Sequence, residues 1–209
     1  MTDTNIDISN KPSPHSVRNR LARVLWGVTQ ATLFRLSPRP LGKWRRFLLT
    51  LFGASMANGA KVGPRARIWG PWNLTMGEFA TISDDVDVYC VAPISVGSHT
   101  TISQYSYLCG ATHDHTHPRF PLEPKAITIG SGCWLAADVY VAPGVCIGDG
   151  TVVGARSSVF GDLPPGMICI GTPAKAIKER VMGDATPHEN LPAGERPPDL
   201  PAPPHGDAA

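Results

Sequence analysis

Six aliphatic residues that stand six positions apart constrain the fold of this chain more than any other feature. Each opens a hexad, and the fifth place of each hexad is also small or apolar. The openers are Ile129, Leu135, Val141, Ile147, Val153 and Val159. This period is too long for the alternation of a strand, and it does not fit an amphipathic helix. A six-residue repeat with aliphatic openers predicts a parallel β-helix, in which each hexad forms one face of a triangular coil.

The repeat also runs upstream, with interruptions. Aliphatic openers recur from Val62 onward, with two-residue slips before Met76 and Val96. Five aliphatic–glycine pairs are expected to mark equivalent corners of about five coils: Val62-Gly63, Met76-Gly77, Val96-Gly97, Ile129-Gly130 and Ile147-Gly148. The period stops after Leu108 and returns at Ile129. A segment of this length that leaves a compact repeat and returns to it favours a functional loop, which we place at residues 109–128.

Composition limits the other possibilities. A length of 209 residues favours one domain with tails, and a net charge of +2 argues against a nucleic-acid partner. The five cysteines have no CxxC spacing, which favours reduced packing residues in a cytoplasmic protein. Residues 1–16 are polar and lack the features of a signal peptide, so we expect a disordered N-terminus. Residues 182–209 are rich in Pro, Gly and Ala, and we expect a disordered tail.

Residues 17–55 are predicted to form basic amphipathic helices, one over Val17 to Leu36 and one over Pro40 to Phe52. Neither has the roughly twenty uninterrupted apolar residues that a transmembrane helix needs. One interpretation is that they cap the open end of the β-helix and cover its edge. A second, compatible interpretation adds contact of residues 17–52 with an anionic membrane surface. Residues 56–181 are expected to form the β-helix domain, which ends in a short helix over Thr172–Val181.

The interruption contains three histidines, His113, His115 and His117, within five residues. They fit a polar surface loop, a metal site or a general base. A closed structural zinc site needs four ligands and the loop contains no cysteine, so we predict no metal. Histidine has a pKa near neutrality, so it can take a proton from a hydroxyl and return it to a leaving group.

The hexads, the histidine loop and the ending Gly171-Thr172-Pro173-Ala174-Lys175 resemble the left-handed β-helix (hexapeptide-repeat) acyltransferases. The resemblance covers Val62 to Arg180. Within that superfamily the chain is most similar to the colanic-acid-type exopolysaccharide O-acetyltransferases. Shorter and more discriminating fragments carry this second likeness: residues 37–41 (SPRPL), 44–49 (WRRFLL), 66–69 (ARIW), 71–74 (PWNL) and 85–89 (DVDVY).

The resemblance implies an acetyl-CoA-dependent enzyme that forms homotrimers, with the cofactor in the groove between neighbouring β-helices. It implies that His113 is the general base. Trp134 matches an aromatic beside the pantetheine arm of the cofactor. Ala137 and Ala155 match corner positions whose backbone groups face that arm. Lys175 matches a basic position near the nucleotide phosphates.

Other roles follow from the residues themselves. Asp114, directly after His113, either orients the imidazole or stabilises the turn. Ser83, Asp85 and Tyr89 lie one coil before the loop and could face the groove as acceptor-binding residues. They offer the hydrogen-bonding groups and the aromatic surface that a sugar site needs. They also fit the polar exterior of a β-helix coil.

We therefore predict an all-β fold, a left-handed parallel β-helix of hexapeptide repeats with N-terminal helices and a short C-terminal helix. The predicted activity is transfer of acetyl from acetyl-CoA to a sugar hydroxyl in exopolysaccharide biosynthesis, on a sugar or a lipid-linked oligosaccharide. The predicted location is the cytoplasm, with the inner face of the membrane as an alternative within it. Alternatives are another acceptor (serine, an amino sugar or an antibiotic), a metal enzyme resembling the γ-type carbonic anhydrases, and a non-catalytic scaffold. A covalent route through Cys133 or Cys109 is a further alternative, although a buried thiol is usually inert.

Overall fold

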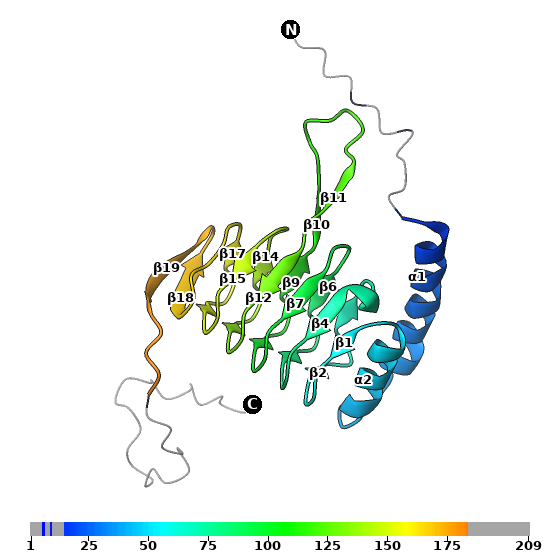
Figure 1. Ribbon diagram of the computed structural model, residues 1–209, viewed down its shortest axis with the longest axis horizontal. Helices are drawn as coiled ribbons and strands as arrows, with labels where there is room; N and C mark the ends of the chain where they lie inside the picture. The colour runs from blue at the N-terminus through cyan, green and yellow to red at the C-terminus, as the bar shows by residue number, and fades with distance from the viewer. Residues whose placement is uncertain (1–5, 7–8, 10–14, 184–209) are drawn as a thin grey trace, which may run out of the picture.

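A computed structural model describes residue 6, residue 9 and residues 15–183 of the chain. These residues wind into a triangular parallel β-helix with helices packed against its N-terminal end (Figure 1). The segments expected to be disordered, 1–16 and 182–209, lie almost entirely outside the described residues.

Three sheets form the faces of the β-helix. Face A contains β1 (Ser55–Met56), β4 (Leu74–Met76), β7 (Ile94–Val96), β12 (Ile127–Ile129) and β15 (Cys146–Ile147). Face B contains β2 (Lys61–Val62), β5 (Thr81–Ile82), β8 (Thr101–Ile102), β13 (Trp134–Leu135), β16 (Val152–Val153) and β18 (Met167–Gly171). Face C contains β3 (Arg67–Ile68), β6 (Asp87–Tyr89), β9 (Tyr107–Cys109), β14 (Tyr140–Val141) and β17 (Ser158–Val159). Within the described residues, the strands make five complete coils and β18 begins a sixth.

The hexad openers form the core of the β-helix. All six have an exposed fraction of 2% or less. Each points into the interior of the β-helix, which has room for one or two side chains from each face in each coil. A fully buried aliphatic side chain contributes about 1.5–3 kcal/mol to stability. The two-residue slips have the same origin. Strands β4 and β7 are three residues long, so alternation points both their first and third residues inward: Leu74 and Met76, and Ile94 and Val96.

Four of the five aliphatic–glycine pairs mark one corner, where face A turns into face B. At that corner the amide of Gly130 donates to Ile147 O at 2.8 Å, and the preceding coils repeat the contact. The prediction was wrong for Val62-Gly63, which lies at the corner between faces B and C and donates to Ile82 O. The reason is that Val62 belongs to face B, so Met56-Ala57 forms the equivalent corner of the first coil.

Gly130 has no room for a side chain, because the next coil stacks directly on it. A Cβ atom at this position would lie 2.6 Å from the backbone nitrogen of Asp149. We expect Gly130→Ala to lower the free energy of unfolding by about 1–3 kcal/mol, measured by urea denaturation. Gly161→Ala is the matched control, because a Cβ there meets nothing within 4 Å. Equal losses for the two variants would contradict this account of the corner.

The N-terminal segment forms α1 (Val17–Thr29), the π-helical turn η1 (Gln30–Phe34) and α2 (Gly42–Leu51). A short 3-10 turn, η2 (Pro71–Asn73), lies within the coils. Trp26 of α1 is buried, and its Nε1 donates to Ile68 O at 2.7 Å. The side chain of Gln30 accepts from the amide of Ile68 at 2.7 Å. Helix α1 and η1 therefore supply hydrogen-bond partners to Ile68 at the free edge of β3, as the capping interpretation expects. Among the described residues, no helix is long and apolar enough to cross a membrane.

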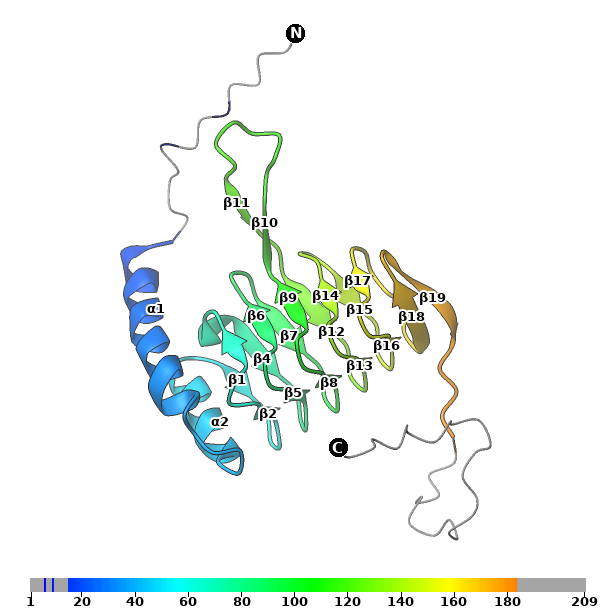
Figure 2. The same ribbon diagram turned by 180° about the vertical axis from the view of Figure 1, so that it is seen from behind.

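The interruption of the repeat is an arm with a two-stranded base. Strands β10 (Ala111–His113) and β11 (Leu122–Pro124) pair antiparallel, with Thr112 opposite Glu123. The arm leaves the β-helix between β9 and β12, at the corner that joins face C to face A. Both views show it projecting from the coils (Figure 1, Figure 2). The segment predicted as a loop is therefore a β-hairpin at its base.

The predicted helix over Thr172–Val181 is wrong. Residues Ala174–Glu179 form strand β19, which pairs antiparallel with β18. Without it, β18 would leave an open edge with a row of unpaired backbone groups. Those groups supply hydrogen-bond partners that override the helix preference of the alanine, lysine and glutamate residues in this segment.

Candidate active site

The imidazole of His113 is held in one orientation by the arm. His113 ends β10 and is exposed, and its Nδ1 lies 2.7 Å from the carbonyl oxygen of Phe120. A carbonyl oxygen only accepts hydrogen bonds, so Nδ1 carries the proton in this contact. In the neutral ring, Nε2 is therefore the atom with a free lone pair.

Asp114 stabilises the turn that follows. Its Oδ1 accepts from the amide of Thr116 at 2.9 Å and from the Thr116 hydroxyl at 2.5 Å. The hydroxyl contact is the main reason that the pKa of Asp114 lies below its usual value. Within the described part of the chain, Asp114 makes no hydrogen bond to His113. Of the two roles considered for it, the geometry favours the turn.

Neither a metal site nor a nucleophilic cysteine is supported by the contacts of the remaining candidate groups in the described chain. His117 Nδ1 accepts from the amide of Arg119 at 3.1 Å. Across residues 15–183, no group of three or more His, Cys, Asp or Glu side chains is placed to hold a metal ion. Cys133 is 2% exposed, and burial raises the pKa of its thiol, so the nucleophilic thiolate is disfavoured.

Trp134, Ala137 and Ala155 lie along one side of the β-helix, and we call them the ridge. Trp134 is on face B with 49% of its surface exposed, and its Nε1 donates to Ser103 Oγ at 3.1 Å. Ala137 and Ala155 occupy equivalent places in successive corners between faces B and C, where Arg156 N donates to Ala137 O at 2.9 Å. The amides of the two alanines have no partner among the described residues, so both N–H groups are available to a ligand.

Lys175 lies on the same sheet as Trp134, although it is on a strand rather than the expected helix. It is exposed on β19 opposite Ile170 of β18, and face B continues through β16 to β13. The pairing of β19 with β18 therefore extends face B and carries a cation at the far end of the ridge.

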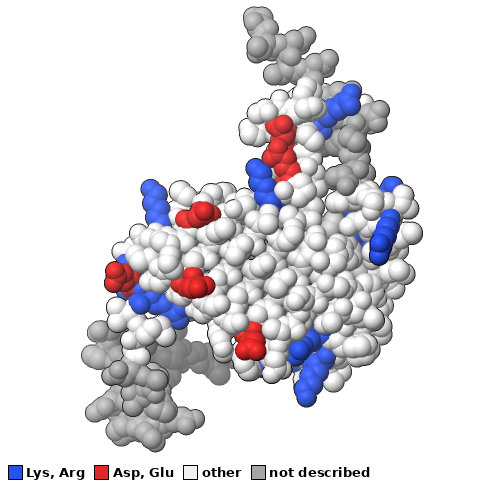
Figure 3. Space-filling view, in the orientation of Figure 1, with Lys and Arg blue, Asp and Glu red and all other residues white. Residues whose placement is uncertain are grey.

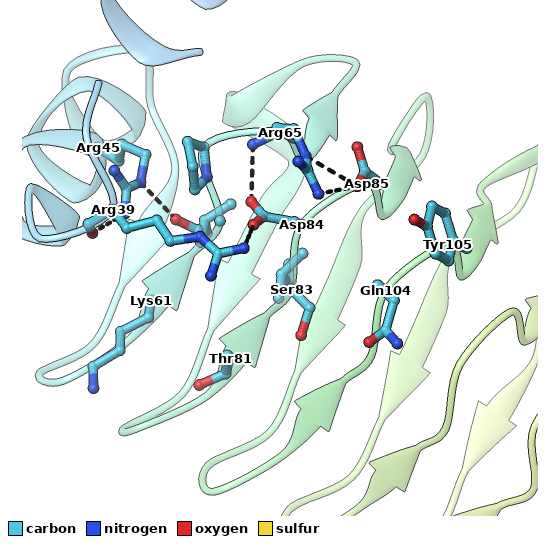
Figure 4. Close-up of a pocket in the computed structure, with 14 residues that line it drawn as sticks. Arg39, Arg45, Lys61, Arg65, Thr81, Ser83, Asp84, Asp85, Gln104 and Tyr105 are labelled. Carbon is cyan, nitrogen blue, oxygen red and sulfur yellow. Dashed lines mark hydrogen bonds and ion pairs between the residues drawn. The ribbon is translucent and has the colours of Figure 1, made fainter. Parts of the chain in front are cut away.

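Two of the three proposed acceptor residues line one pocket. Ser83 and Asp85 face a pocket of about 430 Å³ at the corner between faces B and C (Figure 4). The sequence interpretation missed Lys61, Thr81 and Tyr105, which line it as well. Lys61 pairs with Thr81 in register, so an alignment of hexads on face B would have indicated both.

Tyr89, which was predicted to bind the acceptor together with Ser83 and Asp85, does not line this pocket. Its strand belongs to face C, and its ring packs between Trp69 at 6.0 Å and Tyr107 at 6.4 Å, measured between ring centroids. Three-residue strand β6 turns Val88 inward and Tyr89 outward, away from the corner that Asp85 occupies.

Most charges at the pocket are already paired. Arg39 Nη2 lies 2.9 Å from Asp84 Oδ2, and Arg65 Nη2 lies 2.7 Å from Asp85 Oδ2. Arg45 is buried and donates to protein oxygens. Among the described residues, Lys61 has no ion pair, so it is the pocket cation available to a ligand.

Comparison with known proteins identifies the family. The bacterial transferase hexapeptide family (six repeats) matches residues 126–161. WcaF of Escherichia coli K12, named as a colanic acid biosynthesis acetyltransferase, is 49% identical over 177 residues, which cover 84% of this chain and 97% of that protein. The chain belongs to the hexapeptide-repeat acetyltransferases. The resemblance noted from the hexads and the shorter fragments is confirmed.

Solved structures agree with this acetyltransferase fold. A galactoside acetyltransferase in complex with coenzyme A superposes with a TM-score of 0.73 at 25% identity, covering 81% of this chain and 86% of that one. The hexapeptide-repeat acetyltransferase VCA0836 of Vibrio cholerae O1 biovar eltor, complexed with acetyl coenzyme A, superposes with a TM-score of 0.75 at 23% identity. That likeness covers 85% of this chain and 97% of VCA0836, and it shows a shared fold.

One chain of this hexapeptide-repeat acetyltransferase separates its candidate catalytic groups. His113 is carried by the arm at the corner between faces C and A, which is the corner opposite face B. Trp134 and Lys175 lie on face B, and the two ridge alanines lie at its border with face C. Within a single copy, His113 and the ridge therefore lie on different sides of the β-helix.

Proposed function

We propose that this protein transfers an acetyl group from acetyl-CoA to a hydroxyl of a sugar unit used in exopolysaccharide synthesis. The observation that carries the proposal is the imidazole of His113, oriented by Phe120 O so that Nε2 can accept a proton. The 49% identity to WcaF supports an acceptor from exopolysaccharide synthesis. The likeness to a galactoside acetyltransferase supports a sugar hydroxyl as the nucleophile.

The ridge offers the groups that an extended thiol arm requires. Acetyl-CoA, when bound, supplies the acetyl group as a reactive thioester. The amides of Ala137 and Ala155 would donate to the amide oxygens of the pantetheine arm, and the exposed ring of Trp134 would pack against it. Lys175 would face the nucleotide phosphates from the end of face B.

His113 supplies the proton transfers. Its Nε2 takes the proton of the acceptor hydroxyl while that oxygen attacks the thioester carbonyl. The Phe120 carbonyl accepts from Nδ1, so it holds the ring in place and stabilises the imidazolium that forms. The imidazolium then returns its proton to the departing sulfur. Positioning both reactants in one groove accounts for much of the remaining acceleration.

The acceptor sugar is placed in the pocket lined by Ser83 and Asp85. Thr81 adds a hydroxyl, and Tyr105 adds an aromatic surface that is 63% exposed at the same corner. Such a combination of hydrogen-bonding groups and an aromatic ring suits a saccharide. Lys61 extends the set with a cation.

We further propose that two copies of the chain form each active site in a homotrimer. The separation of His113 from the ridge within one chain supports this arrangement. A subunit-complementation assay tests it with two variants. His113→Gln removes the proposed base, and Ala155→Trp places a bulky side chain on the ridge where the cofactor would bind. Each is expected to be inactive alone. When the two chains are co-expressed in equal amounts and assemble at random, the whole population should recover about a quarter of wild-type activity, because about one site in four would combine two intact halves. In each mixed trimer, that is one of the three sites. No recovery in mixed trimers confirmed by mass would contradict shared sites.

Release of free thiol from acetyl-CoA, measured against a panel of acceptors, tests the proposed function itself. We expect turnover with hexoses or glycosides that carry free hydroxyls, and acetyl esters in the products. Turnover with serine or an amino sugar alone would replace the sugar-hydroxyl assignment with another acceptor class. Turnover that depends on added zinc would instead favour metal chemistry.

A further inference from the structure

The N-terminal segment, residues 17–51, exposes a group of large apolar side chains, which we call the apolar band. Eleven of the twenty exposed large hydrophobic residues in the described chain belong to it. They are Val17, Leu21, Val24, Leu25, Val28, Leu33, Leu36, Leu41, Trp44, Phe47 and Leu51. Single exposed apolar residues are common, but a concentration of eleven of them within one segment indicates an interaction surface.

The band lies on the side of α1 that faces away from the coils. Val17, Leu21, Val24, Leu25 and Val28 follow the spacing of one helix face, and each is 62% exposed or more. Trp26 projects from the opposite face of the helix and packs on the first coil. The β-helix therefore accounts for one apolar side of α1, and the second side requires a different partner.

The charge of the same segment is one-sided. Residues 17–52 contain eight arginines and lysines and no aspartate or glutamate, whereas the whole chain has a net charge of only +2. The rest of the chain therefore has a net charge of 2 − 8 = −6. Figure 3 shows the helical end with blue and white atoms and no red in that view. Arg18, Arg20, Arg35 and Lys43 are exposed beside the band.

We propose that the apolar band docks on the surface of an anionic lipid bilayer. The helices would lie in the interface plane, with the band in the boundary between headgroups and acyl chains and with the flanking cations on lipid phosphates. A second copy of the chain fits this surface less well. Two such faces would bring the exposed cations of both copies together, and residues 17–52 contain no acidic residue to compensate them.

Docking would also place the acceptor pocket next to the lipid surface. Arg39, three residues before the start of α2, and Arg45 within α2 both line that pocket. An acceptor sugar carried on a lipid would then reach the pocket without leaving the bilayer. This last consequence rests on the proposed function, whereas the docking itself does not.

Vesicle flotation of the full chain tests the proposal. We expect the protein to float with vesicles of phosphatidylglycerol and phosphatidylcholine, less at high salt, and weakly with phosphatidylcholine alone. The variant Val24→Glu/Val28→Glu changes two exposed side chains of the band and should reduce the bound fraction about tenfold or more. The control Ile177→Glu/Val181→Glu changes exposed apolar residues at the other end of the molecule and should bind as the wild type does.

Two measurements check that the band variant is correctly folded. They are thiol release with a water-soluble acceptor and the temperature of thermal unfolding. Both should be unchanged in Val24→Glu/Val28→Glu, so a loss of flotation would not reflect misfolding. Absence of flotation by the wild type, or equal flotation by the band variant, would overturn the proposal. If the wild type self-associated without vesicles and Val24→Glu/Val28→Glu were monodisperse, a second copy of the chain would be the partner of the apolar band. Failure of acetyl transfer with intact flotation would overturn the proposed function alone.

Discussion

Replacement of His113 by glutamine is expected to lower the turnover number for acetyl transfer by about 10²–10⁴-fold. A glutamine amide can still donate to the carbonyl of Phe120, so the arm should keep its shape. It cannot take a proton from the acceptor hydroxyl. The affinity for coenzyme A, measured by calorimetry, should stay within about twofold of the wild type, because the substitution removes a group that acts on the transition state.

The control for this substitution is His115→Gln, which changes an exposed histidine of the same arm. It should retain near-wild-type turnover in the thiol-release assay. If His113→Gln retained full activity, the base would have to be another group, and His115 and His117 would be examined next. Loss of coenzyme A binding together with turnover would indicate a structural rather than a proton-transfer role.

Replacement of Arg45 by methionine is expected to cost about 3 kcal/mol or more of unfolding free energy. The guanidinium is 4% exposed and donates to Val62 O at 2.8 Å, Ser37 Oγ at 3.0 Å, Pro38 O at 2.9 Å and Arg39 O at 2.9 Å. It thus joins α2 to the preceding turn and to face B. A methionine would fill part of the space and remove the donors of these buried and partly buried oxygens.

Urea denaturation of Arg45→Met beside Arg46→Met measures this contribution. Arg46 is the next residue of α2 and is only half-buried, so its loss should cost less than about 1 kcal/mol. Similar losses for the two variants would contradict a special role for the buried guanidinium. Because Arg39 is held by Arg45 and lines the acceptor pocket, we also expect Arg45→Met to raise the KM for the acceptor.

The repeat made most of the fold predictable. One aliphatic residue per hexad points into a core that accommodates one or two inward side chains on each face of each coil, so a six-residue spacing has few structural solutions. The arm was also predictable, because the period stops and returns around it. The family fragments then indicated the acetyltransferase class, which comparison with WcaF confirms.

Predictions from the local sequence pattern were wrong where a contact with another coil or strand determines the secondary structure or the position of a side chain. The residues of β19 prefer a helix, yet the open edge of β18 draws them into a sheet. Tyr89 was expected near Ser83 and Asp85 because it is close in sequence, but a corner places it on another face. Asp114 was a candidate partner of the base, whereas a carbonyl from seven residues further along the arm holds His113.

The sequence by itself determined the β-helix, its interruption and the basic helices, because each depends on the periodicity or composition of a continuous stretch. Only the tertiary structure decided which ring nitrogen of His113 is free, which residues share the pocket between faces B and C, and that the helices keep an apolar side in solvent. The physical reason is that these properties depend on backbone and side-chain partners from other coils or across a hairpin. The one-dimensional pattern of hexads records which residues point inward but not which of the outward ones meet.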